Sequence, residues 1–181
     1  GGDFVLSTDW RGSYKHVLKA GQNIATNLNK QIENKHIDQM AIQALLPVGR
    51  LKLVSGEGNL FSKLLAQQGY VFKTAEIDLT SSPAKGLNGN IFVDSLAYND
   101  LRVDTLIMDL NTNQTGLNYS LQILNKADNN YPYKGLVYGS LFERGMDASL
   151  AVTDMNDKIA LALSAQAEMK GQGINLSLTS A

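Results

Sequence analysis

The fold is decided by residues 87–124, which have the sequence LNGNIFVDSLAYNDLRVDTLIMDLNTNQTGLNYSLQIL. Three runs in this stretch alternate apolar and polar residues at period two. Each run ends in a cluster of Asn, Asp, Thr or Gly, which favours reversal of the chain. In the third run the odd-numbered residues 117–123 are apolar and the even-numbered residues 118–122 are polar. The stretch therefore predicts three strands of a sheet with one apolar face and one polar face.

The rest of the chain after Gly69 continues this pattern. We expect further strands over residues 70–79, 133–142, 146–152, 159–169 and 174–178, separated by short polar connectors. Short connectors favour antiparallel neighbours, because a parallel crossover needs a dozen or more residues. We also expect short strands over residues 3–8 and 50–54, so the sequence predicts a long antiparallel meander.

The N-terminal third has a different period. From Trp10 apolar residues recur every three or four positions for about 20 residues, which predicts an amphipathic helix. A second short helical pattern around residues 37–45 ends before Pro47, and a third over residues 59–68 ends at Gly69. We therefore expect one mainly β, α+β domain over residues 1–181, with a helical portion at 10–69 and a β-sheet portion at 70–181. The sheet is expected to be curved, with two or three helices packed on its apolar face.

Composition excludes several classes of function. The chain has 181 residues, a net charge of -1 and no cysteine. Without a basic field it is not expected to bind nucleic acid, and without thiols it has neither disulfides nor thiolate metal sites. No apolar run reaches the roughly 18 residues of a membrane-spanning helix. Gly1-Gly2 resembles a cloning junction, so we expect the chain to be a piece of a longer protein.

The predicted helices are too small to cover the predicted sheet. About nine strands of about eight residues give an apolar face of roughly 1,100 Å². About 42 helical residues cover only about 600 Å². Each exposed Leu, Ile or Val forgoes about 1.5 to 3 kcal/mol, so something else must cover the remainder. The sheet could close into a sandwich or barrel, pack on chain outside this sequence, or hold an apolar ligand such as an acyl chain.

No pattern in the sequence indicates catalysis. His16 and His36 are the only histidines, and neither has a partner at a catalytic spacing. Residues 55–59 precede a helix but lack the Gly-Lys-Ser/Thr ending of a P-loop. Residues 154–158 lack the glycine and glutamate of a calcium loop. We expect no enzyme activity, no metal and no cofactor.

Four ordered segments resemble an interior portion of TamB-like translocation and assembly module proteins, within the AsmA-like group of Gram-negative envelope proteins. They are NKHIDQMAIQALLP at 34–47, EIDLTSSPAKGLNG at 76–89, VDTL at 103–106 and TGLNYSL at 115–121. The resemblance implies a periplasmic piece of a very long protein, anchored in the inner membrane by a segment outside this sequence. It also implies a β-sheet groove, apolar inside, that moves phospholipid between the two membranes or assists outer-membrane protein assembly. The helical portion at 10–69 departs from a uniform groove.

This interpretation names partners and contact residues. The expected partners are phospholipid acyl chains, adjacent segments of the same long chain and an outer-membrane assembly protein. The alternative is a structural or interaction module with a closed core, no ligand and edge strands that pair with other chains. Strand parity assigns the lipid contacts to Leu106, Met108, Leu110, Leu117, Tyr119, Leu121, Ile123, Leu150, Val152, Leu161, Leu163, Leu176 and Leu178.

Overall fold

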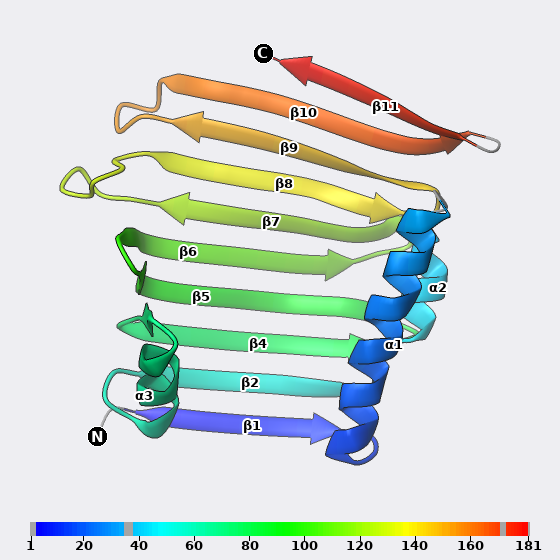
Figure 1. The fold of residues 1–181 in the computed structure, drawn as a ribbon, viewed down its shortest axis with the longest axis horizontal. Coiled ribbons are helices and arrows are strands. Elements are labelled where there is room, and N and C mark those ends of the chain that lie inside the picture. The colour runs from blue at the N-terminus through cyan, green and yellow to red at the C-terminus, as the bar shows by residue number, and fades with distance from the viewer. Residues whose placement is uncertain (1–2, 35–37, 171–172, 181) are drawn as a thin grey trace.

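A computed structural model of the chain describes residues 3–34, 38–170 and 173–180. It contains one open, curved, antiparallel sheet of eleven strands and three helices. Ten of the strands lie side by side in chain order, and the two-residue strand β3 pairs with β5 beside this path (Figure 1). The predicted mainly β meander is therefore confirmed.

The bounds of the elements follow. The strands are β1 (Phe4–Trp10), β2 (Gly49–Gly56), β3 (Tyr70–Val71), β4 (Thr74–Ser82), β5 (Gly86–Tyr98), β6 (Leu101–Thr112), β7 (Gly116–Leu124), β8 (Lys134–Phe142), β9 (Gly145–Thr153), β10 (Ile159–Lys170) and β11 (Gly173–Ser180). The helices are α1 (Tyr14–Glu33), α2 (Gln39–Ala44) and α3 (Leu60–Gln67).

The predicted strand over residues 70–79 is wrong, because the chain breaks there into β3 and β4. Phe72 lies in the break and is 4% exposed, and the backbone N–H of Lys73 donates to the carbonyl of Asp94. Opposite the break, Ser95 has a φ of 57°, so β5 is irregular at the same level. Burying Phe72 takes precedence over continuing the alternation, and the strand count rises to eleven.

Helices α2 and α3 begin at polar residues whose side chains accept hydrogen bonds from free N–H groups of the first turn. Asp38 accepts from the N–H of Ala41 at the start of α2, and Asn59 accepts from the N–H of Ser62 at the start of α3. The backbone of α3 turns away at Gly69, whose φ of 86° suits glycine. His36 and Ile37 of the predicted second helix lie outside the described residues.

The three helices lie at the two ends of the strands (Figure 1). The long helix α1 crosses one set of strand ends with α2 beside it, and α3 lies over the opposite ends of β2 and β4. Phe61 of α3 contacts Phe4 and Phe72, with ring centroids 6.0 and 6.3 Å apart. The broad middle of the sheet lies between these two ends.

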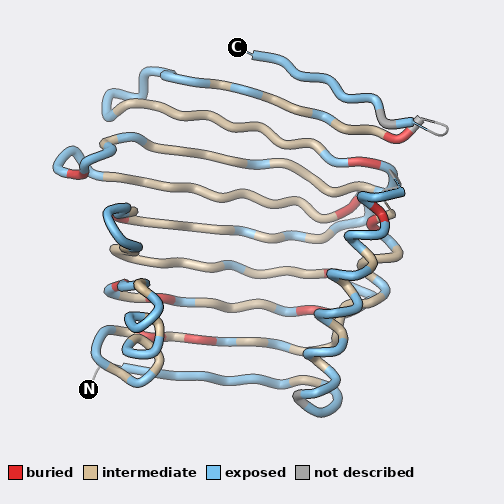
Figure 2. Tube along the Cα trace, viewed as in Figure 1, coloured by how far each residue is buried: buried red, intermediate tan, exposed pale blue. Residues whose placement is uncertain are grey.

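Few apolar side chains are fully buried, and most of these lie close to one helix. Among the described residues, the buried apolar side chains are Leu53, Phe72, Ala75 and Met169. Leu53, Phe72 and Ala75 belong to β2 or to the β3–β4 segment, the region nearest α3. Most of the central strands are only half-buried, as Figure 2 shows. The sheet is therefore well buried at the corner next to α3, and most of the rest of it is a single layer.

Candidate functional site

The pairing register aligns apolar residues in rows that cross the sheet. Directly opposed residues of an antiparallel pair share a face, so a row can be followed from one strand to the next. The longest row passes through nine strands from β1 to β10. Its members are Leu6, Leu53, Ile77, Ile91, Met108, Leu121, Val137, Leu150 and Leu163. We call this face of the sheet, with the two neighbouring rows described next, the apolar face.

Two neighbouring rows extend the apolar face along the strands. One contains Phe4, Ser55, Ala75, Val93, Leu106, Ile123, Gly135, Val152 and Leu161, and the other contains Thr8, Leu51, Leu79, Gly89, Leu110, Tyr119, Gly139, Ala148, Ala165 and Leu178. Polar members are Ser55, Thr8 and the hydroxyl of Tyr119. None of the three rows carries a charged side chain.

The register places all thirteen predicted contact residues on one side of the sheet. Those on β6 and β7 pair directly as Leu106 with Ile123, Met108 with Leu121, and Leu110 with Tyr119. Those on β9 and β10 pair as Leu150 with Leu163 and Val152 with Leu161. Leu117, Leu176 and Leu178 lie opposite Leu141, Ala167 and Ala165 of the same side. Their contact with lipid stays a prediction.

The sequence interpretation missed the other half of this face. Leu53, Ile77 and Ile91 continue the longest row on β2, β4 and β5. Their signal was present, because residues 49–56 and 74–82 alternate at period two like the later strands. The apolar face therefore reaches to β1 at one edge of the sheet.

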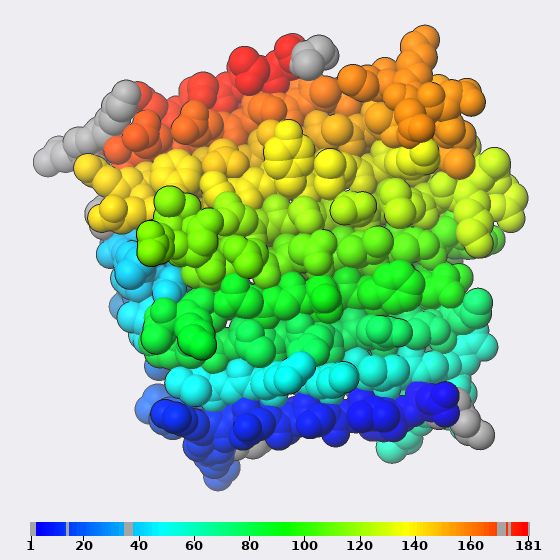
Figure 3. Space-filling view, turned by 180° about the vertical axis from the view of Figure 1, so that it is seen from behind, coloured from blue at the N-terminus to red at the C-terminus, as the bar shows by residue number. Residues whose placement is uncertain are grey.

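The opposite face is mainly polar. One of its rows contains Ser7, Lys52, Asp78, Asn90, Asp109, Ser120, Tyr138, Ser149, Ser164 and Thr179. A mixed row beside it includes Val54, Phe92 and Ile107 next to Glu76 and Gln122. Because α3 packs on Phe4, the apolar face is turned towards α3, and Figure 3 views the sheet from the opposite side. The two faces thus differ both in charge and in the number of apolar residues.

Exposure shows that, away from α3, the described residues place no second layer over the apolar face. Leu53, next to α3, is 5% exposed, whereas the central residues of the same row are half-buried. Towards the last strands exposure rises, to 37% for Leu163 and 68% for Leu178. The surface is open and large, and the part of it between the helices carries no side-chain layer from the described residues.

Tyr119 is fixed on this face by its hydroxyl. The Tyr119 hydroxyl donates to the carbonyl of Asp147 at 2.9 Å, two strands away. Gly139 lies between them, and a Cβ there would approach the Tyr119 hydroxyl to 2.8 Å. Partial burial, and secondarily the nearby Asp147 carboxylate, raises the pKa of Tyr119 above its usual value. Tyr119 therefore lies across the glycine and closes a gap in the apolar surface.

Asp104 is a buried carboxylate on β6. A polar residue on a strand is expected to face outward, and this expectation is wrong for Asp104, which is 1% exposed and lies on the same side as Leu106. Its carboxylate accepts from the N–H of Lys126 at 2.8 Å and from the amide of Asn129 at 3.1 Å, and the Arg102 guanidinium is 2.6 Å away. These donors, the Lys126 N–H first, hold the pKa of Asp104 below its usual value. The cluster fixes the loop between β7 and β8.

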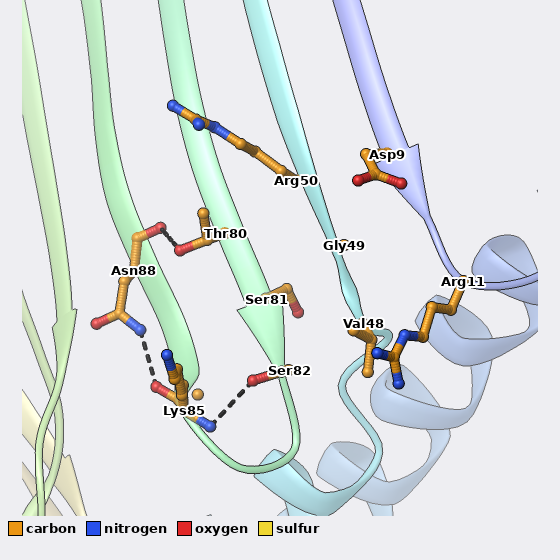
Figure 4. A pocket seen from close by; sticks show the side chains of 11 residues that line it. Asp9, Arg11, Val48, Gly49, Arg50, Thr80, Ser81, Ser82, Lys85 and Asn88 are labelled. Carbon is orange, nitrogen blue, oxygen red and sulfur yellow. Dashed lines mark hydrogen bonds between the residues drawn. The ribbon is translucent and has the colours of Figure 1, made fainter.

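A polar hollow of about 360 Å³ lies at the strand ends near α1 (Figure 4). It is lined by Arg11, Arg50, Lys85, Asn88 and their neighbours on β1, β2, β4 and β5. Arg50 is engaged by Asp78 at 2.7 Å, which raises the pKa of Arg50 and lowers that of Asp78. Asn88 donates to the carbonyl of Lys85, and the Lys85 N–H donates to Ser82. These bonds account for the hollow as part of the β4–β5 hairpin.

No group of three or more His, Cys, Asp or Glu that could hold a metal ion occurs among the residues described. Within the same residues, no helix is both long and apolar enough to cross a membrane. The chain was compared with family models, curated proteins and solved structures, and none of them matches it. The assignment of a function therefore depends on the geometry of the apolar face.

Proposed function

We propose that the chain is a non-enzymatic segment of a TamB-like envelope protein and that its apolar face holds phospholipid acyl chains. The observation that carries this proposal is the row of nine apolar residues from Leu6 to Leu163, which no second layer of the described residues covers except near Leu53, under α3. Leaving such a row in water is costly, because each fully exposed aliphatic side chain forgoes about 1.5 to 3 kcal/mol. An acyl chain lying along the row removes this cost without a polar partner.

The same proposal accounts for the contrast between the two faces. A bound acyl chain offers no hydrogen bonds, so charged side chains beneath it would lose their hydration without compensation. The three apolar rows hold no charge, while the polar face carries Lys52, Asp78 and Asp109 in a single row. In this proposal the periplasm is the compartment, phospholipid is the cargo, and the remainder of the long protein supplies the membrane anchor.

Site-specific photocrosslinking tests the proposal with a control on the same strand. Leu121 and Ser120 are both half-buried neighbours on β7 and point to opposite faces. Benzoylphenylalanine at position 121 should crosslink to phospholipid from vesicles, and the same probe at position 120 should not. Equal crosslinking at both positions, or none at 121 in a folded variant, would overturn the proposal.

A charge on the apolar face gives a second test. Leu121→Asp places a carboxylate in the centre of the longest row, and it should remove the phospholipid that co-purifies with the protein in native mass spectrometry. Ser120→Asp is the matched control on the polar face and should retain the lipid. Far-UV circular dichroism of both variants shows that the sheet is intact.

A second candidate function is strand addition at the open edges of the sheet. In β11 no residue is charged, and its Leu176 and Leu178 are 66% and 68% exposed. Edges that must stay free usually carry charges, proline or bulges. The path contains ten alternating strands, so β1 of a following sheet would pair antiparallel with β11 and keep the apolar face continuous. This observation favours an adjacent segment of the long chain, or an assembly partner, at each edge.

Edge pairing is tested by charging β11. Ser177→Lys with Thr179→Lys places two cations on the polar side of the edge strand. If the edges pair, light scattering should show concentration-dependent association of the unmodified chain that the double variant lacks. Ser120→Lys, on the central strand β7, should leave the association unchanged.

A further inference from the structure

The helix α1 has an exposed apolar stripe that its own chain does not cover. Leu18, Leu28 and Ile32 are 49%, 43% and 63% exposed. With the exposed Ala25 they are spaced seven, three and four residues apart, so they share one side of the helix. Isolated exposed leucines are ordinary, but an aligned stripe along a helix indicates a docking surface.

The stripe cannot turn inward, because another side of α1 is already held. Gln31 donates to the carbonyl of Asp38 at 3.0 Å and accepts from the N–H of Asp38 at 2.8 Å, which joins α1 to the start of α2. Val17, Ala20 and Ile24 are the less exposed apolar residues of the helix. Ala20 lines a hollow of about 520 Å³ together with Arg11, His16, Lys19, Asn23 and residues 44–48. This inner side and the apolar stripe are separate sectors of one helix.

The third sector of α1 is positively charged. Residues 10–33 contain Arg11, Lys15, Lys19 and Lys30 and a single acid, the exposed Glu33. The whole chain has 16 basic and 17 acidic residues, so the other 157 residues hold 12 and 16 of them. The helix is therefore a positive segment on a chain whose remainder is negative.

These cations are available to an external partner. Arg11, Lys15, Lys19 and Lys30 are all exposed. The side-chain ion pairs of the described residues lie elsewhere, on Arg50, Lys73, Arg102 and Lys134. Leu18, Leu28 and Ile32 each have a lysine within two positions in the sequence: Lys19 follows Leu18, and Lys30 lies between Leu28 and Ile32.

We propose that α1 docks on an anionic phospholipid surface, with Leu18, Leu28 and Ile32 in the acyl boundary and Lys15, Lys19 and Lys30 at the headgroup phosphates. A helix with an apolar stripe beside a cationic sector lies in the plane of a membrane interface, because both sectors gain there at once. The partner is a lipid surface and not a second protein face, because Arg11 and α1 together carry four cations against the single carboxylate of Glu33. This docking is independent of the apolar face of the sheet.

Vesicle partitioning tests the proposal on the intact chain. Binding to vesicles of 30% phosphatidylglycerol in phosphatidylcholine should exceed binding to pure phosphatidylcholine and should weaken as salt rises. Each lysine near an anionic surface contributes about fivefold, so Lys15→Gln with Lys19→Gln should lower the partition coefficient by about 30-fold. Lys63→Gln with Lys158→Gln, which changes two exposed lysines elsewhere, is the matched control and should bind normally.

The stripe has its own variants and control. Leu28→Asn with Ile32→Asn should lower the partition coefficient by more than tenfold, because both apolar insertions are lost. The control Leu60→Asn with Leu101→Asn changes side chains that are 75% and 59% exposed on other elements. It should leave the partition coefficient unchanged. The proposal would be overturned if neither the lysine variant nor the stripe variant changed vesicle binding. It would also be overturned if the stripe variant converted a dimer to a monomer without affecting vesicle binding. Lipid crosslinking at position 121 reports separately on the sheet and should persist in every α1 variant.

Discussion

Truncating leucines at two points of one row distinguishes an open face from a covered one. Leu53 and Leu121 both belong to the longest row of the apolar face, but Leu53 is 5% exposed and Leu121 is half-buried. Leu53→Ala removes a packed side chain under α3 and leaves a cavity, so the free energy of unfolding should fall by about 3 kcal/mol.

The cost at Leu121 should be much smaller. Water or lipid can reach the side chain, so no closed cavity forms and only part of the transfer free energy is lost, which amounts to about 1 kcal/mol. The assay is urea unfolding of delipidated protein, followed by far-UV circular dichroism, with the denaturant m-value checked for constancy. The two variants should therefore differ by about 2 kcal/mol in the free energy of unfolding.

The controls separate local from general effects. Leu136→Ala on β8 changes a half-buried leucine of the opposite face and should resemble Leu121→Ala. Added phospholipid should stabilise the unmodified chain more than Leu121→Ala, since ligand binding to the folded state raises its stability. If Leu121→Ala costs as much as Leu53→Ala without lipid, then the face is covered in solution and the reasoning fails.

Three further predictions concern positions that hold the sheet in shape. Asp104→Asn should lower the free energy of unfolding at pH 7 by about 3 kcal/mol, because a buried charge-assisted cluster loses its carboxylate. The folded-state pKa of Asp104 is depressed, so its stabilisation is full above the unfolded pKa near 4 and disappears as pH falls towards the folded pKa. The difference between the unmodified chain and Asp104→Asn should therefore shrink below about pH 4 in urea titrations; a constant difference would contradict the assignment. Gly89→Ala should cost more than 2 kcal/mol in thermal unfolding, because its φ is 136° and a Cβ there would lie 1.9 Å from the carbonyl oxygen of Asp78. Gly21→Ala is its control, since the space around that glycine is open and a helix gains from alanine. Asn59→Ala should cost about 1 kcal/mol by removing the cap of α3, and a loss confined to Asn59→Ala but absent in Asn59→Ser would identify capping as the cause.

The strands and their faces were predictable because each run alternates apolar and polar residues at period two. From β5 to β11 most connectors are short, and the alternation is regular apart from Ser95 of β5 and a register shift at the start of β10. Adjacent strands therefore pair in register, and parity carries over from one strand to the next. The bounds of β6 and β7 follow the apolar pattern closely. Residues 70–79 are an exception, because the predicted strand is interrupted there. The pattern continues through Phe72, but the packing of Phe72 beneath Phe61 breaks the strand, and Phe61 lies in another element.

The burial of Asp104 depends on contacts between distant segments of the chain, which the alternation along one strand does not show. The sequence marks Asp104 as a polar residue on a strand, yet its partners Lys126 and Asn129 lie beyond another strand and a turn. Amphipathic periodicity likewise shows that a helix needs a partner and not where it lies. The sequence-based estimate that the helices cover less area than the apolar face of the sheet agrees with the structure, because α3 covers only one corner and α1 runs across the strand ends (Figure 1).

The direction of the apolar rows determines how the proposed cargo would lie. The longest row runs across the strands through nine of them, so its eight steps of about 4.8 Å span about 38 Å. The hydrocarbon core of a bilayer is about 30 Å thick, so one leaflet's acyl chain occupies less than half of the row. A lipid that moves along the row meets apolar contacts at every strand and no charge until it reaches an edge. The strand order leaves both edges free to continue the same face, since β11 runs opposite to β1. Conduction beyond 38 Å therefore requires that β1 and β11 be joined to further strands, which makes the edge strands as important to the proposed function as the apolar residues themselves.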